Sequence, residues 1–203
     1  MAAPIVNNNS IEKTGFCLTS DGFYYYGEQY KYDDVIQTEY VKSIYQRSHV
    51  GIGVTSSSTS VGFTILMKTG QIVKVVEQIS WKTDKCEPEK AESFFNIISQ
   101  KTLRNRALIY DKQVKERGCF EYSGWNFFPK DKKIVDTKRN ETYFINETTF
   151  SREFGAVHVS RKNEGLGSKF LKKVVGGGRS INTIRDTDVF FALLKHYFNL
   201  AWS

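Results

Sequence analysis

Two glycine-rich runs in the second half of the chain have the residue types of a phosphate cradle. They occupy residues 165–169 (GLGSK) and 176–180 (GGGRS). Glycine allows several backbone N–H groups to converge on one anion. However, neither run has the Walker spacing, and a dinucleotide site needs a strand directly before the glycines and a helix directly after them. We therefore predict flexible turns around a β-hairpin here rather than a nucleotide site.

Metal or nucleophilic chemistry has little support, because the candidate side chains are scattered. The histidines and cysteines are His49, His158, His196, Cys17, Cys86 and Cys119. A zinc site normally shows its ligands at short spacing, and an odd, scattered set of cysteines indicates reduced thiols in a cytosolic protein. We predict no metal, no cofactor and no enzyme. An enzyme remains an alternative only if His49 or His158 lies in a pocket with a cysteine or a carboxylate.

Basic residues are the strongest functional signal, and their distribution is uneven. Residues 1–110 contain 12 Lys and Arg against 11 Asp and Glu, whereas residues 111–203 contain 17 against 11. Each Lys or Arg near an anionic membrane contributes about 1 kcal/mol of attraction. The predicted ligand-binding residues for an anion are Lys130, Lys132, Lys133, Lys138, Arg139, Lys169, Lys172, Lys173 and Arg179. The alternative is a solvated surface, because Asp131, Asp136 and Glu164 are interspersed with these cations.

Nucleic acid is a competing partner for the basic half. Proteins that bind single strands place aromatic faces for the bases beside a basic groove for the phosphates. Seven of the eleven tyrosines lie between Tyr24 and Tyr45, in the half that is almost neutral. Aromatic and basic residues are thus separated, which argues against one continuous groove. Exposed tyrosines would instead suit a protein interface.

The elements that must position these residues follow a repeated pattern. SFFNIIS at residues 93–99 aligns with VFFALLK at residues 189–195, an offset of 96. At the same offset, an alternating glycine and aromatic segment at residues 22–26 aligns with residues 118–122. Each helical phrase follows a stretch of short β-patterned segments. The pattern predicts one unit used twice, with strands first and a closing amphipathic helix last.

Local signals place the longer elements. A strand is expected over residues 35–45, and the Ser/Thr run at residues 55–60 is predicted to be a mobile tip between two strands. One helix should begin near Glu87, ahead of Pro88, and its apolar residues Ala91, Phe94, Phe95, Ile98 and Leu103 should form a one-sided stripe. The last helix should begin at Asp186 as its N-cap and continue through Trp202.

These elements predict an α+β fold of two small β-barrel or sandwich units, each closed by a C-terminal amphipathic helix. A chain of 203 residues suits two domains of about 100 residues. We predict a flexible tail at residues 1–10, a first unit at 11–107, a connector at 108–117 and a second unit at 118–203. No apolar run approaches the roughly 20 residues that a membrane span requires.

The first unit resembles the opening of pleckstrin-homology-like domains, especially bacterial ones. The resemblance rests on LTSDG at residues 18–22, YYYG at 24–27 and KYDDV at 31–35, the last at the opening of a third strand. It implies a module that recognises phosphoinositides, peptides or partner domains without catalysis. In members that bind phosphoinositides, the first hairpin loop supplies Lys and Arg. In the second unit Lys130, Lys132 and Lys133 would fill that role, whereas the loop at residues 27–29 of the first unit has no such charges.

We therefore expect a cytoplasmic adaptor or scaffold, peripheral at a membrane, with tandem pleckstrin-homology-like units. Its partner would be a protein or an anionic lipid headgroup. Nucleic acid is the alternative partner.

Overall fold

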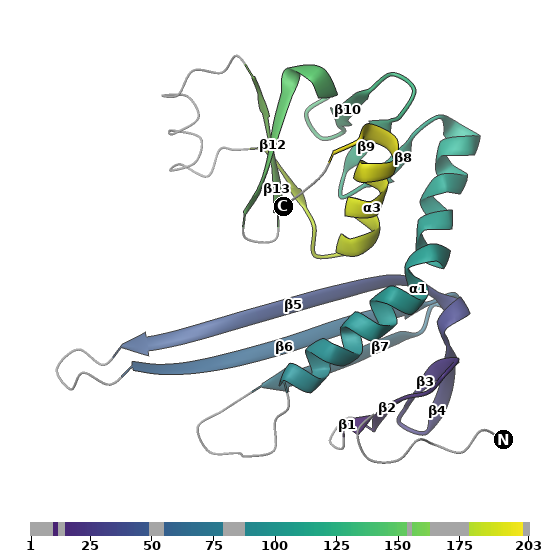
Figure 1. The fold of residues 1–203 in the computed structure, drawn as a ribbon, viewed down its shortest axis with the longest axis vertical. Helices are drawn as coiled ribbons and strands as arrows, with labels where there is room; N and C mark the ends of the chain where they lie inside the picture. The colour runs from purple at the N-terminus through teal and green to yellow at the C-terminus, as the bar shows by residue number, and fades with distance from the viewer. Residues whose placement is uncertain are drawn as a thin grey trace. The chain divides into compact units, whose positions relative to one another are not determined.

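The chain forms two compact units, Met1–Asn105 and Arg106–Ser203 (Figure 1). The computed structural model describes residues 10–11, 15–48, 55–78, 88–153, 156–162 and 179–200. Unit 1 contains 11 Lys and Arg against 11 Asp and Glu, and unit 2 contains 18 against 11. The formal net charge of +7 therefore belongs entirely to unit 2.

Unit 1 begins with a four-stranded antiparallel sheet and continues with a three-stranded one. Their strand orders are β1-β2-β3-β4 and β5-β6-β7, and the short 3-10 helix η2 (Tyr32–Asp34) separates them. The strands are β1 (Ser10–Ile11), β2 (Phe16–Leu18), β3 (Gly22–Tyr25), β4 (Glu28–Lys31), β5 (Val35–Ser48), β6 (Thr55–Met67) and β7 (Ile72–Gln78).

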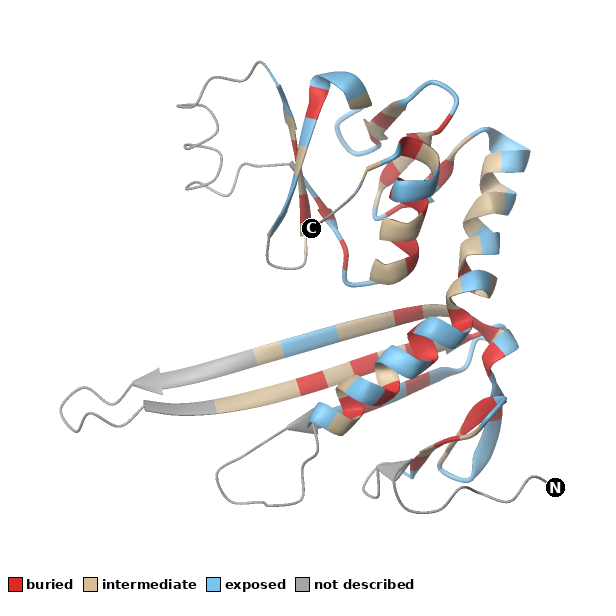
Figure 2. Ribbon diagram, viewed as in Figure 1, coloured by how far each residue is buried: buried red, intermediate tan, exposed pale blue. Residues whose placement is uncertain are grey.

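The core of unit 1 is shared by both sheets and the first part of α1 (Pro88–Arg117). Ala91, Phe94 and Ile98 are buried, as the predicted apolar stripe requires. The ring of Phe16 lies 6.1 Å from that of Phe94 and 5.5 Å from that of Phe63, measured between centroids. Buried and exposed residues alternate along this part of α1 in Figure 2. The helix thus covers one face of β5-β6-β7.

The Ser/Thr run at residues 55–60 is a strand, so its prediction as a mobile tip is wrong. It forms the first part of β6 and pairs in register with β5, from Ser48 opposite Thr55 to Ser43 opposite Ser60. A continuous antiparallel ladder satisfies the backbone groups of this polar segment. The composition alone does not show this pairing.

Unit 2 has the same order of elements. A four-stranded antiparallel sheet is followed by the 3-10 helix η3 (Ile145–Glu147), a three-stranded sheet and a helix. These elements are β8 (Phe120–Tyr122), β9 (Trp125–Phe128), β10 (Lys133–Asp136), β11 (Glu141–Phe144), β12 (Thr148–Glu153), β13 (Ala156–Arg161), β14 (Arg179–Asn182) and α3 (Thr187–Phe198).

The mixed α+β class is confirmed, but none of the four sheets formed by the described residues closes into a barrel. The strand ladders are interrupted at η2 and η3, so the two sheets of each unit remain separate.

Part of the predicted repeat alignment is wrong. Residues 22–26 begin in the third strand of unit 1, whereas residues 118–122 end in the first strand of unit 2. KYDDV does not open a third strand; its residues 32–34 form η2, and η3 occupies the equivalent place in unit 2.

Residues 108–117, predicted as a connector, lie inside α1. From Arg106 onwards this helix belongs to unit 2, where the Arg106 side chain is fully buried. Arg106 donates hydrogen bonds to Asp186 Oδ1 at 2.8 Å and to both carboxylate oxygens of Asp188, at 2.9 and 2.5 Å. Burial alone would lower the pKa of the Arg106 guanidinium, but these bonds to Asp188 and Asp186 outweigh it and raise that pKa. The guanidinium therefore stays charged.

Both ends of α3 differ in detail from the prediction. Asp186 precedes the helix as expected, but its φ is +42° and its side chain makes no capping hydrogen bond, because the carboxylate binds Arg106. The helix ends at Phe198 rather than continuing through Trp202, and Asn199 follows it with φ of +55°. Asparagine in this left-handed conformation is a common helix stop.

In the part of the chain that the structure describes, no helix has the length and hydropathy needed to cross a membrane.

Candidate anion-binding site

Two turns of unit 2 lie at the same end of the β8–β11 sheet. The β8–β9 turn consists of Ser123 and Gly124, with φ of 50° and 77°, which is the backbone that a two-residue hairpin turn requires. The β10–β11 turn spans residues 137–140 and contains Asn140 at φ of 53°. In an antiparallel meander, alternate turns fall at one edge. The sequence therefore brings these two turns together.

Hydrogen bonds join the two turns to each other and to β14. The backbone N–H and the Oγ1 hydroxyl of Thr137 both donate to the carbonyl oxygen of Gly124, at 3.1 and 2.6 Å. Ser123 Oγ donates to the carbonyl oxygen of Asn182 in β14 at 2.7 Å. Three segments far apart in the sequence thus form one connected frame.

This frame surrounds an open cavity of about 180 Å³. Its lining residues are Ser123, Gly124, Trp125, Asp136, Lys138, Arg139 and Ser180. A water molecule occupies about 30 Å³ of liquid, and cavities for drug-sized ligands run from about 300 Å³. The cavity is therefore large enough to admit a phosphate or carboxylate group and smaller than a site for a drug-sized ligand.

Lys138 and Arg139 supply the positive charge of this cavity. Asp136 Oδ1 accepts hydrogen bonds from the backbone N–H groups of Lys138 at 3.0 Å and Arg139 at 3.4 Å. This Asx-type turn fixes the backbone of the two basic residues. Their side chains are exposed, and neither forms an ion pair with any described residue. Both cations are therefore available to a ligand.

The rest of the lining sets what the cavity accepts. Ser180 is exposed and offers a hydroxyl, which donates or accepts a hydrogen bond. Trp125 is only 4% exposed and packs against Tyr143, with 5.8 Å between ring centroids. Trp125 thus forms a wall and leaves no ring face for a stacked base. Asp136 is almost buried, and its Oδ1 accepts hydrogen bonds from two backbone donors. Its negative charge opposes part of the attraction that Lys138 and Arg139 exert on an anion.

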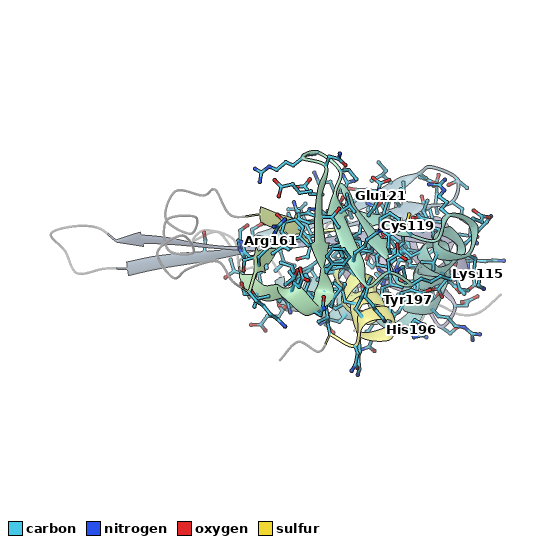
Figure 3. The ribbon with its side chains drawn as sticks, turned by 90° about the horizontal axis from the view of Figure 1, so that it is seen from above. Lys115, Cys119, Glu121, Arg161, His196 and Tyr197 are labelled. Atoms are coloured by element: carbon cyan, nitrogen blue, oxygen red, sulfur yellow. The ribbon has the colours of Figure 1, made fainter. Side chains whose placement is uncertain are left out.

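The other described lysines of the predicted site lie at the opposite end of β10. Lys130 is exposed in the β9–β10 turn. Lys132 Nζ donates to the carbonyl oxygen of Tyr197 at 2.5 Å, near the end of α3, where Figure 3 labels Tyr197 and His196. Lys133 Nζ pairs with Asp131 at 2.8 Å. The structure therefore does not unite these lysines with Lys138 and Arg139, and two of them have intramolecular partners.

The remaining predicted cations cannot be placed in the cavity. Lys169, Lys172 and Lys173 lie outside the described residues, as do the glycine runs apart from Arg179 and Ser180. The backbone of Arg179 begins β14, and its side chain is outside the described part.

Neither of the two described histidines, His158 and His196, lines the cavity. His158 lies in β13, opposite Ser151 of β12 and Ser180 of β14, but it is not a lining residue of the cavity. His49 and Cys86 lie outside the described residues, and no group of three metal-ligating side chains occurs within them.

Sequence reasoning missed Ser123 and Trp125 as lining residues, and it set Ser180 aside when it interpreted the run at residues 176–180 as a turn. The doublet Ser123-Gly124 between two β-patterned segments was the available signal, because such a doublet marks a tight hairpin turn. The contribution of Ser180 has no local signal, because it depends on β14 meeting this turn.

Comparisons of the chain with protein-family models, with curated proteins and with solved structures gave no significant match.

Proposed function

We propose that this chain is a non-catalytic recognition protein with two pleckstrin-homology-like units, in which unit 2 binds anionic lipid headgroups at a membrane surface. Its role would be that of an adaptor or scaffold, peripheral at the membrane. The ligand site is the cavity framed by the β8–β9 turn, the β10–β11 turn and β14.

One observation carries this proposal. Lys138 and Arg139 are adjacent cations on a fixed turn, they have no acidic partner among the described residues, and they border a cavity of about 180 Å³. Lysine acts as a point charge and arginine as a fork of donors, and both bind phosphate oxygens. Exposed cations beside a hollow that can admit a phosphate group support headgroup recognition.

The division of charge supports the same assignment. Unit 2 has 18 Lys and Arg against 11 Asp and Glu, whereas unit 1 is formally neutral. A positive field over unit 2 attracts an anionic surface before any specific contact forms. The resemblance of the sequence to pleckstrin-homology-like domains supports a recognition module, and the element order of strands, 3-10 helix, strands and closing helix in each unit agrees with it. Because fold alone does not decide function, the cavity carries more weight than this likeness.

Nucleic acid is the weaker candidate on this geometry. Recognition of single strands depends on aromatic faces beside the basic groove. Trp125, the aromatic residue that lines the cavity, is almost completely buried. The site therefore offers charge without stacking.

The test is flotation of the full chain with vesicles of neutral phosphatidylcholine and with vesicles containing a phosphorylated inositol lipid, at low and high salt. We expect salt-sensitive binding to the anionic vesicles. The variant Lys138→Ala with Arg139→Ala should lose about 2 kcal/mol, or roughly 30-fold in affinity, at about 1 kcal/mol for each cation. Lys132→Ala with Lys133→Ala is the matched control, because it removes the same charge from the opposite end of β10.

Three results would contradict the proposal. They are no binding to anionic vesicles, equal losses from the two pairs of substitutions, and tighter binding to a single-stranded oligonucleotide than to the vesicles. The second result would leave a diffuse positive field without a site.

A further inference from the structure

The outer face of the β5-β6-β7 sheet is covered by no element among the described residues of unit 1. Its inner face carries Val61, Phe63 and Val75 into the core, whereas side chains at alternate positions point outwards. The strand register arranges the outward positions in rows across the sheet, three of which are Gln37, Leu66 and Ile72; Glu39, Thr64 and Lys74; Val41, Gly62 and Val76. Val41, Ile72 and Val76 are 46%, 62% and 49% exposed. The apolar rows therefore lie on either side of a charged row.

Gly62 stands at the centre of one row without a local reason. It pairs regularly with Val41 and Val76, away from the irregularity between Val35 and Gln37. A Cβ atom there would lie 3.6 Å from its nearest neighbours, an ordinary contact. Glycine weakens a strand interior, and where no bulge or bend requires it, it marks a place where another backbone or a ligand approaches closely. Gly62 leaves a shallow gap between Val41 and Val76.

The charges on this face are complementary to themselves. Glu39 and Lys74 flank Thr64 in one row on the two outer strands, which are about 10 Å apart at the usual strand spacing. In a dimer, two copies would place their outer faces together, related by a two-fold axis that lies between them and parallel to β6. In this arrangement β5 of each copy lies opposite β7 of the other, so Glu39 of each copy faces Lys74 of the other. The contact occurs twice, because a two-fold interface repeats each contact. The same axis sets Val41 against Val76 and brings the two Gly62 backbones together.

We infer that the outer face of β5-β6-β7 is the interface of a two-fold homodimer. This inference is independent of the anion site, because it uses unit 1 and shares no residue with the cavity of unit 2. These rows on three strands form a small contact, below the roughly 800 Å² per partner of a standard interface. A contact of this size is typical of weak, transient association.

The decisive experiment mixes two charge-reversed variants of the full chain. Glu39→Lys places like charges against Lys74 of the other copy, and Lys74→Glu places like charges against Glu39. Each variant alone should sediment as a monomer at low ionic strength. An equimolar mixture should regain the dimer mass, because both cross-interface pairs then have opposite charges. Lys31→Glu, on exposed β4 of the same unit, is the matched control and should dimerise like the unmodified protein.

Gly62→Gln gives a second, uncharged test. The open space at Gly62 accommodates a side chain within the monomer, so the variant should keep its circular dichroism spectrum and melting temperature. In the dimer it blocks the close approach, and the dissociation constant should rise at least tenfold. A monomeric unmodified protein at several hundred micromolar, a mixture no heavier than its components, or a Gly62→Gln protein that still dimerises would each overturn the inference.

Discussion

The buried arginine of unit 2 makes the most direct prediction about stability. Arg106 is fully buried, Asp186 is 2% exposed, and Asp188 is 28% exposed in its side chain. Arg106→Met leaves Asp186 without its cation in a site closed to water. Removing one partner of a buried ion pair costs about 3–5 kcal/mol, because the other charge stays desolvated. The partial exposure of Asp188 places the expected loss towards the lower end of this range.

Hydrogen exchange measured by mass spectrometry separates this effect by unit. Amides of α3 in the Arg106→Met protein should exchange about 100-fold faster or more, since each 1.4 kcal/mol changes the open population about tenfold. Amides of β6 in unit 1 should keep their protection and serve as the internal control. Arg104→Met on the same helix changes an exposed side chain and should shift stability by about 0.5 kcal/mol or less.

A second substitution shows whether the buried charge is the cause. Adding Asp186→Asn to Arg106→Met removes that charge and should recover part of the lost stability. A loss below about 1 kcal/mol for Arg106→Met, or an equal loss for Arg104→Met, would refute the reasoning. No recovery in the double variant would assign the loss to packing rather than to charge.

Two further predictions concern the backbone and the tyrosines of the units. Gly22→Ala should destabilise unit 1 by about 3 kcal/mol or more in urea unfolding, because its Cβ would lie 1.9 Å from the Tyr30 carbonyl oxygen. Gly62→Ala should be near neutral, because its Cβ would lie 3.6 Å from its nearest neighbours. Equal effects of the two substitutions would contradict the packing. Burial raises the pKa of Tyr30, Tyr32 and Tyr197 to about 12. Since a tyrosine in the unfolded chain ionises near pH 10, the stabilisation that these three tyrosines contribute should be complete below pH 10 and be lost as pH rises from 10 through 12. A phenolate absorbance titration complete by pH 10.5 would exclude this burial.

Element types were predictable where the pattern is strong and local. The stripe containing Ala91, Phe94 and Ile98 predicted the helix that closes the core of unit 1. Asp186 was correctly predicted to mark the start of α3. Its ion pair with Arg106 was not predicted, because Arg106 lies 80 residues away in the sequence. A cap preference describes only local hydrogen bonds. The buried network depends on tertiary contacts that no local signal contains.

The candidate site was predicted only in part, and the reason is geometric. Lys138 was named together with Lys132 and Lys133 because the three are close in the sequence. The four-residue strand β10 separates the turns that carry them, so residues six positions apart lie at opposite ends of a sheet. Strand residues advance about 3.4 Å each. Counting charges along the sequence does not give this distance between the two turns. Ser180, 42 residues beyond Lys138, joins the cavity instead.

The two units share an order of elements but differ in the side chains of their turns. The β3–β4 turn of unit 1 and the β10–β11 turn of unit 2 occupy the same place in the strand order, yet the first contains Tyr26 and Gly27 and the second contains Lys138 and Arg139. Turn residues need only satisfy a backbone conformation, so their side chains are open to change without cost to the core. The same freedom applies to the outer face of β5-β6-β7, where Gly62 stands in a regularly paired strand. Lys138 and Arg139, which pair with no described acidic residue, and Gly62, which no backbone conformation requires, contribute little to the stability of the monomer. Each would have a role in the contacts that we propose with other molecules.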